Sequence, residues 1–362
     1  MVRVLQVVTH MNRGGLETML MNYYRQIDRT RVQFDFLTHR DYDGDYGEEI
    51  RQMGGKLYHL PVLNPFSVSY HKALGRFFDA HPEYQVIHVH QDCLSGVILR
   101  VAKQHGVKVR IAHSHGASQI RDLKYPVKLV YRHFIPRYAT HLMACGEDAG
   151  KWMFCGAPFE ILSNAIPAKE YSFRAERRNA QREKWHVQPN ELLVGHVGSF
   201  TTPKNHSFLL DIFDEIQKQT PAKLMIVGDG SQRPGIEEKI RRLGLQDKVI
   251  LTGLRSDVAE LLQAMDVFVF PSLHEGLPVT LVEAQASGLP CLISDKVPIE
   301  CAMTEAVQQL PLDDSPAVWA QKAIRAAQIP RKDTYEEIKA AGYDIAENAA
   351  RLQKMYEKMM EL

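Results

Sequence analysis

Two glutamates, Glu275 and Glu283, stand in the segment of the sequence that most suggests chemistry. Pro278 suits the first turn of a helix, because its missing N–H would have no partner there. We therefore place Glu275, Gly276 and Leu277 in the loop before the helix and Glu283 on the helix itself. Free N–H groups of such a turn can bind a phosphate or a sugar oxygen, and Glu283 could accept both hydroxyls of a ribose. An ordinary solvated helix does not explain this acid–glycine–proline run, so the segment predicts a ligand site.

A lysine loop and two glycine-rich loops are candidates for phosphate contacts. Lys204 lies between a predicted strand and a predicted helix, where its point charge suits a diphosphate; a solvated surface lysine is the alternative. Gly14 and Gly15 open a helix after the first strand and would let the backbone approach an anion, unless they form a plain turn. Neither this pair nor Gly228-Asp-Gly230 has the GxGxxG spacing, which disfavours a dinucleotide dehydrogenase.

Two histidine pairs, His88 with His90 and His113 with His115, come at the ends of predicted strands. The spacing puts both members of each pair on one face, a pattern that can ligate zinc. No cysteine or carboxylate stands at ligand spacing from them, so we interpret His88 and His90 as structural and His115 as a support of the turn. We interpret His113 as a residue that hydrogen-bonds a sugar or a phosphate.

An acidic run at 41–45 is the other metal candidate. It lacks the glutamate at the twelfth position of an EF-hand loop and follows a strand, which favours a solvated acidic loop. The sequence therefore predicts no metal site.

Short β-branched runs, each followed by a helix-length amphipathic segment, must position these residues. The predicted strands are 2–8, 34–38, 86–90, 109–112, 142–145, 192–198, 224–228, 249–252, 267–270 and 290–294. Such apolar runs fit parallel strands that are buried on both faces. The alternation predicts an α/β protein of two doubly wound, Rossmann-like domains that face each other across a cleft, with ligands at the carboxyl ends of the strands. The apolar pattern of 345–360 predicts a closing helix.

The composition is that of an ordinary globular protein of 362 residues, with 45% hydrophobic and 24% charged residues. Disorder, collagen and coiled coil are excluded, and a net charge of +1 argues against nucleic-acid binding. The five scattered cysteines form no CxxC pair and predict reduced thiols. With no signal-peptide pattern at its start and no apolar run of about 18–20 residues, the chain is expected to be cytoplasmic.

A basic amphipathic stretch at 119–138 offers contact with the inner face of a membrane. Its five Lys and Arg residues stand against one acid, Asp122, and apolar side chains lie between them. Such a stretch can lie on anionic lipid. The alternative is a helix that packs on its own domain and keeps a solvated basic face.

Together, these motifs resemble those of the retaining, nucleotide-sugar-dependent glycosyltransferases of family 4, which have the two-domain GT-B fold. The likeness extends over nearly the whole chain, and the glutamate pair is its most specific part. The other matching segments are Gly14-Gly15, His113, Asn164-Ala-Ile-Pro167, Gly198 to Asn205, Gly228-Asp-Gly230, Thr252-Gly-Leu-Arg255 and Ala286-Ser-Gly-Leu-Pro290. The segment 341–352 resembles the subgroup from bacterial exopolysaccharide and capsule gene clusters.

The resemblance implies that residues 1–165, with the C-terminal helix 344–362, bind the acceptor and that residues 166–343 bind the nucleotide-sugar donor. It implies that Glu283 binds the ribose, and that the base lies near Gly228, Gly230 and Arg255. The resemblance implies three catalytic residues, which are His113, Lys204 and Glu275. His113 would contact the 6-position of the sugar or the leaving phosphate, and Lys204 would contact the diphosphate. Glu275 would bind the donor sugar together with the backbone of Gly276, Leu277 and Pro278.

One position departs from the family pattern. The family usually has an arginine five residues before the lysine, and the two clamp the diphosphate; here the residue is Ser199. The missing charge could come from Arg255, Arg13 or helix N-termini, or the enzyme could be weak. No metal ligand stands at the diphosphate, as expected for a fold that uses basic groups and helix dipoles there.

We therefore expect a retaining transfer of sugar from a nucleotide diphosphate, with UDP as the expected nucleotide, to a glycan or polyprenyl-linked saccharide in exopolysaccharide or capsule synthesis. No cofactor and no metal are expected. The resemblance favours attack on the face that the diphosphate leaves. A nucleotide-sugar epimerase is one alternative and would release a rearranged donor without an acceptor. A non-catalytic binding module, conceivable because of Ser199, would bind the donor without transfer.

Overall fold

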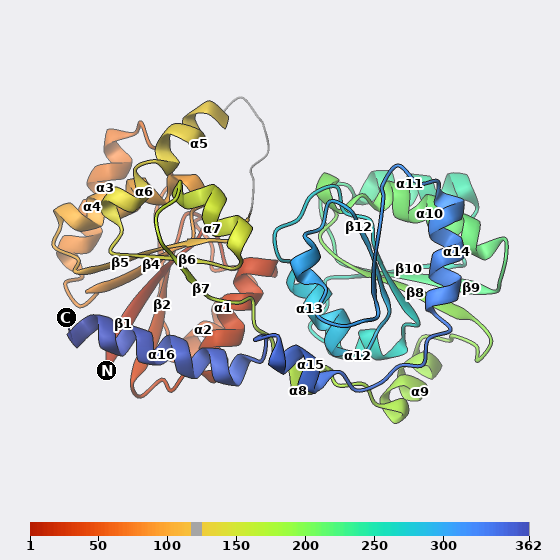
Figure 1. Cartoon of the computed structure of the whole chain (residues 1–362). Helices are drawn as coiled ribbons and strands as arrows, with labels where there is room; N and C mark the ends of the chain where they lie inside the picture. Colours follow the sequence, from red (N-terminus) through yellow and green to blue (C-terminus); the bar gives the residue numbers. More distant parts are fainter. Residues whose placement is uncertain (117–124, 362) are drawn as a thin grey trace. The chain divides into compact units, whose positions relative to one another are not determined.

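The computed structural model describes residues 1–116 and 125–361, and the chain divides into two compact units (Figure 1). Unit 1 comprises Met1–Asn164 and Ile345–Leu362, and unit 2 comprises Ala165–Asp344. Within the described residues, no helix is long and apolar enough to cross a membrane.

Unit 1 alternates strands and helices. Its strands are β1 (Val2–Val7), β2 (Val32–Thr38), β3 (Leu57–His59), β4 (Val86–Val89), β5 (Val109–Ser114), β6 (His141–Ala144) and β7 (Glu160–Ile161). Its helices are α1 (Gly15–Gln26), α2 (Gly47–Gln52), α3 (Val68–Ala80), the 3₁₀ helix η1 (Asp92–Leu94), α4 (Ser95–Gln104), α5 (Tyr125–Arg132), α6 (Ile135–Tyr138), α7 (Glu147–Phe154) and α16 (Ile345–Glu361).

Unit 2 repeats the alternation. Its strands are β8 (Leu192–Val197), β9 (Ala222–Val227), β10 (Val249–Gly253), β11 (Val267–Phe270), β12 (Cys291–Ser294) and β13 (Val307–Leu310). Its helices are α8 (Ala168–Tyr171), α9 (Ala175–Lys184), η2 (Thr202–Lys204), α10 (His206–Gln217), α11 (Arg233–Leu243), α12 (Val258–Ala264), α13 (Val279–Ala286), η3 (Ile299–Cys301), α14 (Pro316–Ala326) and α15 (Tyr335–Ala340).

Each unit has a doubly wound parallel sheet, as the sequence predicts. In the described residues the strand order is β3-β2-β1-β4-β5-β6-β7 in unit 1 and β10-β9-β8-β11-β12-β13 in unit 2. In unit 2, α10 and α14 cover one face of the sheet and α12 and α13 the other (Figure 1). The order reverses between β1 and β4 in unit 1 and between β8 and β11 in unit 2. Ligands of doubly wound sheets bind at the carboxyl ends of the strands at such reversals.

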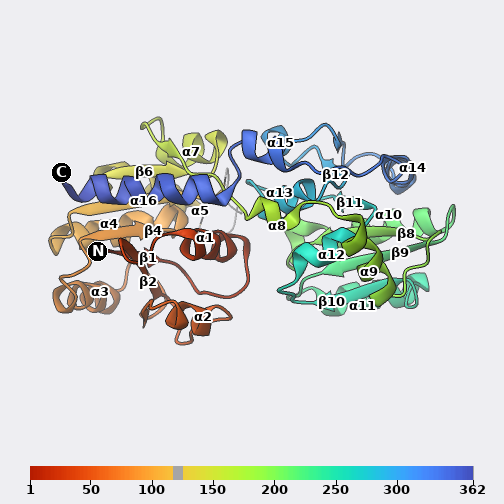
Figure 2. The same cartoon turned by 90° about the horizontal axis from the view of Figure 1, so that it is seen from below.

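The C-terminal helix α16 belongs to unit 1 and lies along α1, β1 and β2 (Figures 1 and 2). Its apolar side buries Ile345, Leu352 and Tyr356, and Tyr356 reaches the sheet. The predicted closing helix is therefore confirmed.

All ten predicted strands are present, with ends within two residues of the predicted ones. The strands β3, β7 and β13 were not predicted. They are short, and β13 (Val307-Gln-Gln-Leu310) keeps its two glutamines exposed at the edge of the sheet, so it has no apolar run to find.

Candidate functional site

The loops after β8 and β11, the strands at which the unit 2 sheet reverses, bring Lys204 and Glu275 into contact. Lys204 Nζ donates a hydrogen bond to Glu275 Oε1 at 2.6 Å, and the same ammonium lies 4.7 Å from the centroid of the Phe270 ring. The two side chains are only 16% and 11% exposed, so both charges are largely withdrawn from water. A cation beside a carboxylate can hold an anionic group and a hydroxyl group of one ligand.

Backbone contacts between the two loops fix the position of Lys204. The amide of Leu273 donates to the carbonyl of Pro203 at 2.7 Å, and Asn205 Nδ2 donates to the carbonyl of Pro271 at 3.1 Å. Asn205 has a φ of +53°, a left-handed conformation that asparagine tolerates, and it ends η2 so that α10 begins at His206. Lys204 therefore projects from a braced turn.

Two glycines let the loop after β9 pack backbone to backbone on the loop after β8. Gly228 and Gly230 have φ values of 141° and 159°, and a Cβ at Gly228 would collide with the carbonyl of Gly198. The amide of Gly198 donates to Val227 at 2.9 Å, and that of Phe200 donates to Asp229 at 2.9 Å. The predicted role of these glycines in binding a base stays a prediction, whereas their packing role is visible.

Glu283 lies on α13, five residues after the N-cap Pro278 and thus in the second turn of the helix. Its side chain is buried, and Oε1 accepts a hydrogen bond from Tyr171 Oη at 2.8 Å. Burial raises the pKa of Glu283 to about 7, although the Tyr171 hydrogen bond lowers it. A buried carboxyl group with a shifted pKa at the carboxyl end of a sheet is a candidate functional group.

Five buried polar atoms around these loops have no hydrogen-bond partner among the described residues. They are Ser272 Oγ, in the loop after β11, Thr280 Oγ1, in the first turn of α13, His196 Nε2, on β8, and both ring nitrogens of His206, the first residue of α10. An unsatisfied buried polar group costs about 1–3 kcal/mol, so these atoms are candidates for contacts with a ligand. Ser272, Thr280 and Tyr171 could not be predicted from the sequence, because serine, threonine and tyrosine in a loop or short helix form no recognisable pattern.

Position 199 carries no positive charge here, and the guanidinium of Arg255 is paired with a carboxylate. Ser199 is exposed, and its Oγ lies 3.3 Å from Thr201 Oγ1. Arg255 donates to both carboxylate oxygens of Asp257, at 2.8 and 2.7 Å, and lies 5.9 Å from the Trp185 ring centroid. Arg255 would have to leave Asp257 to compensate for the arginine that Ser199 replaces.

Three predicted site residues belong to unit 1. Gly14 is the N-cap of α1, and Glu17 Oε2 occupies the space that a Cβ at Gly14 would take. Glu17 is buried, and burial raises its pKa to about 7. The start of α1 at Gly15 is therefore faced by a carboxyl group of the helix itself. The predicted roles of Gly14, Gly15 and His113 toward a donor stay predictions.

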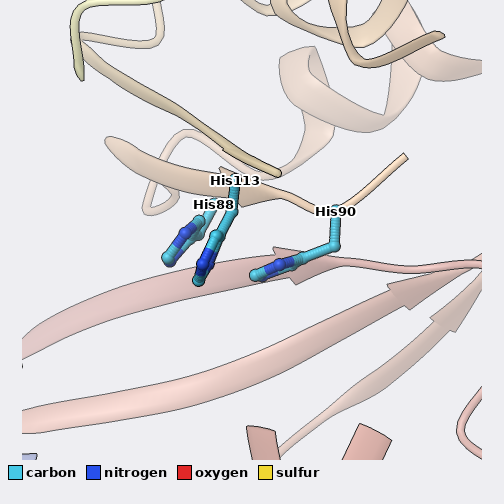
Figure 3. Close-up of side chains that lie close together, drawn as sticks. All are labelled: His88, His90 and His113. Carbon is cyan, nitrogen blue, oxygen red and sulfur yellow. The ribbon is translucent and has the colours of Figure 1, made fainter. Parts of the chain in front are cut away.

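Three histidines of unit 1, His88, His90 and His113, approach one another at the carboxyl ends of β4 and β5 (Figure 3). His115 continues the cluster, because its Nε2 lies 2.8 Å from His90 Nδ1. Burial lowers the pKa of His88 to about 3 and those of His90 and His113 well below the ordinary value. In the acidic run at 41–45, Asp43 pairs with Arg51, and its Oδ1 lies 2.9 Å from His59 Nε2.

Comparisons with known proteins identify the family of the chain. Residues 14–154 match the family described as glycosyl transferase 4-like domain, and residues 191–328 match glycosyl transferases group 1. The chain is 37% identical to the putative glycosyltransferase EpsF of Bacillus subtilis, over 98% of this chain and 96% of that protein. The chain belongs to this glycosyltransferase family.

Two further comparisons concern more distant proteins. This glycosyltransferase is 25% identical to the Escherichia coli UDP-Gal:alpha-D-GlcNAc-diphosphoundecaprenol alpha-1,3-galactosyltransferase, over 59% of this chain and 58% of that protein. The crystal structure of Anabaena Alr3699/HepE in complex with UDP superposes with a TM-score of 0.79 at 17% identity and covers 99% of this chain and 100% of that one. The GT-B fold and the family resemblance predicted from the sequence are both confirmed.

Proposed function

We propose that this glycosyltransferase moves a sugar from UDP to a polyprenyl-linked saccharide with retention of configuration. The observation that carries the proposal is the contact between Lys204 and Glu275 at the β8–β11 reversal. Both side chains are largely buried, and Ser272 Oγ and Thr280 Oγ1 lack partners at the same edge. Support for UDP comes from the UDP-bound fold neighbour, and support for the acceptor comes from the E. coli relative, which is named as a diphosphoundecaprenol galactosyltransferase.

In this proposal Lys204 stabilises the charge that develops on the diphosphate when the glycosidic bond to the donor breaks. The acceptor hydroxyl attacks the anomeric carbon on the face that the diphosphate leaves, and a phosphate oxygen takes the hydroxyl proton. Glu275 accepts hydrogen bonds from the hydroxyls of the sugar and also anchors the lysine. Glu283 receives the ribose hydroxyls. No step needs a metal ion, because the lysine and the first turn of α13 meet the negative charge.

A thermal-shift screen against a panel of nucleotides and nucleotide sugars tests the proposal. A ligand that binds the folded chain alone raises the midpoint of unfolding, by about 2.7 kcal/mol of stability at 100 times its Kd. UDP and one UDP-sugar should stabilise the chain more than the GDP, CDP and ADP counterparts, equally in EDTA and in magnesium. A preference for another nucleotide, or stabilisation that needs magnesium, would refute this assignment of the donor site.

Ser199→Arg should tighten UDP binding. The exposed Ser199 side chain can be replaced without loss of a buried contact, and a guanidinium in the loop of Lys204 would add a charge-assisted hydrogen bond to the diphosphate. A gain of about 1 kcal/mol, roughly fivefold in Kd, is expected in calorimetry with UDP. Thr201→Arg, two residues along the same loop, is the control for general charge attraction. An equal gain in both variants, or none in Ser199→Arg, would show that position 199 does not face the diphosphate.

A peripheral location on the inner face of the membrane is a further part of the proposal. Residues 119–124 of the basic stretch lie outside the described residues, and the rest forms α5 and α6. No residue of α5 is buried, and Val130 is 57% exposed. Phe66, 71% exposed, lies 6.2 Å from the Tyr131 ring, which lies 6.3 Å from the partly exposed Phe134. Arg132 does not contribute to a solvated basic face. Its guanidinium donates a hydrogen bond to the carbonyl of Trp152 and lies over the indole ring of the same residue.

Sedimentation with anionic vesicles should pellet the chain at low salt and less of it at high salt. Each basic residue near the surface contributes about 1 kcal/mol, and the exposed aromatic side chains add apolar contact. Phe66→Ser should weaken pelleting. Val318→Ser on α14 of unit 2 removes an exposed apolar side chain elsewhere and should not. Equal pelleting of these two variants, or none for the natural chain, would contradict a membrane role for this surface.

A further inference from the structure

The histidine cluster of unit 1, which consists of His88, His90, His113 and His115, contains buried ring nitrogens without hydrogen-bond partners among the described residues. One ligand atom each of His88, His90 and His113 lies within 4.8 Å of the others. His88 Nε2 and both ring nitrogens of His113 are buried and have no hydrogen-bond partner among the described residues. The three side chains are at most 4% exposed. Because a buried orphan nitrogen costs about 1–3 kcal/mol, the cluster is incomplete as it stands.

The sheet itself directs these side chains to one face. Gln6 of β1 pairs with His88 of β4, and His88 pairs with Ile111 of β5. Paired residues of parallel strands point to the same side, as do residues two apart along a strand. His90 and His113 therefore join His88 on the face of the sheet on which α16 packs. The two pairs are distant in sequence, and neither has a cysteine or a carboxylate at ligand spacing, so the sequence alone predicted no metal site.

The hydrogen bonds around the cluster leave lone pairs directed inward. The amide oxygen of Gln6 can only accept, so His90 Nε2 donates to it at 2.9 Å, and the lone pair of neutral His90 is on Nδ1. His88 Nδ1 lies 2.7 Å from Tyr356 Oη and can donate to it, which leaves the lone pair of His88 on Nε2. A ring N–H held by an outer partner is the arrangement that orients metal-binding histidines.

We propose that His88 Nε2, His90 Nδ1 and one nitrogen of His113 bind a divalent transition metal ion, with Zn²⁺ as the first candidate. Imidazole ligands without carboxylates suit this class of ion and not Mg²⁺ or Ca²⁺. Zn–N distances of about 2.0–2.1 Å bring tetrahedral ligand atoms within about 3.4 Å of one another, so the side chains rotate inward from their present spacing. His90 Nδ1 then exchanges its contact with His115 for the ion. Gln6 and Tyr356 hold the outer N–H groups.

The ion would join β4 and β5 directly, and through Gln6 and Tyr356 it would also brace β1 and α16. It would be a site of unit 1, and His113 would bind the ion instead of making the donor contact that the family resemblance implies, whereas Lys204 and Glu283, the residues assigned to UDP, belong to unit 2. Zinc binding can therefore fail while UDP binding succeeds, and the reverse.

Zinc titration of the whole chain tests the proposal. After dialysis against EDTA, the chain is titrated with Zn²⁺ in competition with a chromophoric chelator, and separately with Co²⁺ while visible absorption is recorded. One ion per chain and a Co²⁺ d–d band are expected. His88→Phe should weaken binding by more than 100-fold, and Tyr356→Phe, which removes only the outer partner, by about 10–100-fold.

An exposed histidine provides the matched control. His186→Asn removes an imidazole from unit 2 at a left-handed position that asparagine tolerates, and it should leave zinc affinity unchanged. Circular dichroism in EDTA checks that each variant is folded. If His88→Phe is unfolded, Tyr356→Phe becomes the variant that tests the proposal. Failure of the natural chain to bind one equivalent of Zn²⁺ or Co²⁺, or a zinc affinity that is unchanged in the decisive variant, would overturn the proposal and leave a metal-free histidine cluster.

Discussion

Glu275→Ala should abolish sugar transfer and leave UDP affinity intact or slightly raised. Glu275 is assigned to the transferred sugar, so its contacts matter most as the sugar flattens and charge moves onto the phosphate. The structure adds that Glu275 also accepts the hydrogen bond of Lys204 at 2.6 Å. Its removal leaves the ammonium free to face the diphosphate alone. A fall in kcat of about 10²–10³-fold is expected, the scale of one lost transition-state contact.

Calorimetry with UDP beside a transfer assay measures both effects on one preparation. Glu300→Ala, which removes an exposed carboxylate of the same unit, is the matched control and should change neither quantity. Lys204→Met is the complementary variant and should weaken UDP binding and slow transfer together. If Glu275→Ala lost UDP binding as badly as Lys204→Met, the ion pair would be a structural brace of the loop and the division of roles would be wrong.

The sequence was sufficient for the fold because the strands buried on both faces are short apolar runs with a helix after each. Even so, β13 was not predicted, because its sequence Val-Gln-Gln-Leu has two exposed glutamines and no continuous apolar run. The donor site was predicted from motifs of known spacing, and the structure shows that Lys204 and Glu275 are in contact. The specific roles of these residues remain predictions.

Contacts between residues far apart in sequence could not be predicted in the same way. Tyr171 lies 112 residues from Glu283, and only the fold shows that its hydroxyl group meets the carboxylate. Likewise, only the structure shows that Arg255 pairs with Asp257, and that His88, His90 and His113 form one cluster because β4 and β5 are neighbours in the sheet. Spacing along the chain shows which residues share an element, but not which elements meet.

Glu283→Ala should weaken UDP and the UDP-sugar alike, by roughly 1.5–3 kcal/mol for a lost charged acceptor, or about 10–150-fold in Kd. The same carboxyl group should make UDP affinity depend on pH. Its pKa is about 7, so it is mostly protonated at pH 6 and mostly ionised at pH 8. If the ionised form accepts the ribose hydroxyls, UDP affinity should rise about tenfold over this interval. In Glu283→Gln, UDP affinity should change with pH only as far as the ionisation of the UDP phosphate near pH 6 requires.

The free energy of unfolding should fall as the pH rises, whereas UDP affinity should increase. The ordinary pKa of a glutamate is 4.5, so between pH 4.5 and 7 the folded chain keeps a proton that the unfolded chain releases. The stability that this proton confers is complete below pH 4.5 and is lost as pH rises through 7, a loss on the order of 3 kcal/mol. Glu283→Gln should therefore raise the Tm at pH 8 and change it little at pH 5. Tyr171→Phe, which removes the hydrogen bond that lowers this pKa, should move the midpoint of the UDP dependence to higher pH. A flat pH dependence of UDP binding in the natural chain, with no stabilisation by Glu283→Gln at pH 8, would show that Glu283 is neither buried as described nor part of the donor site.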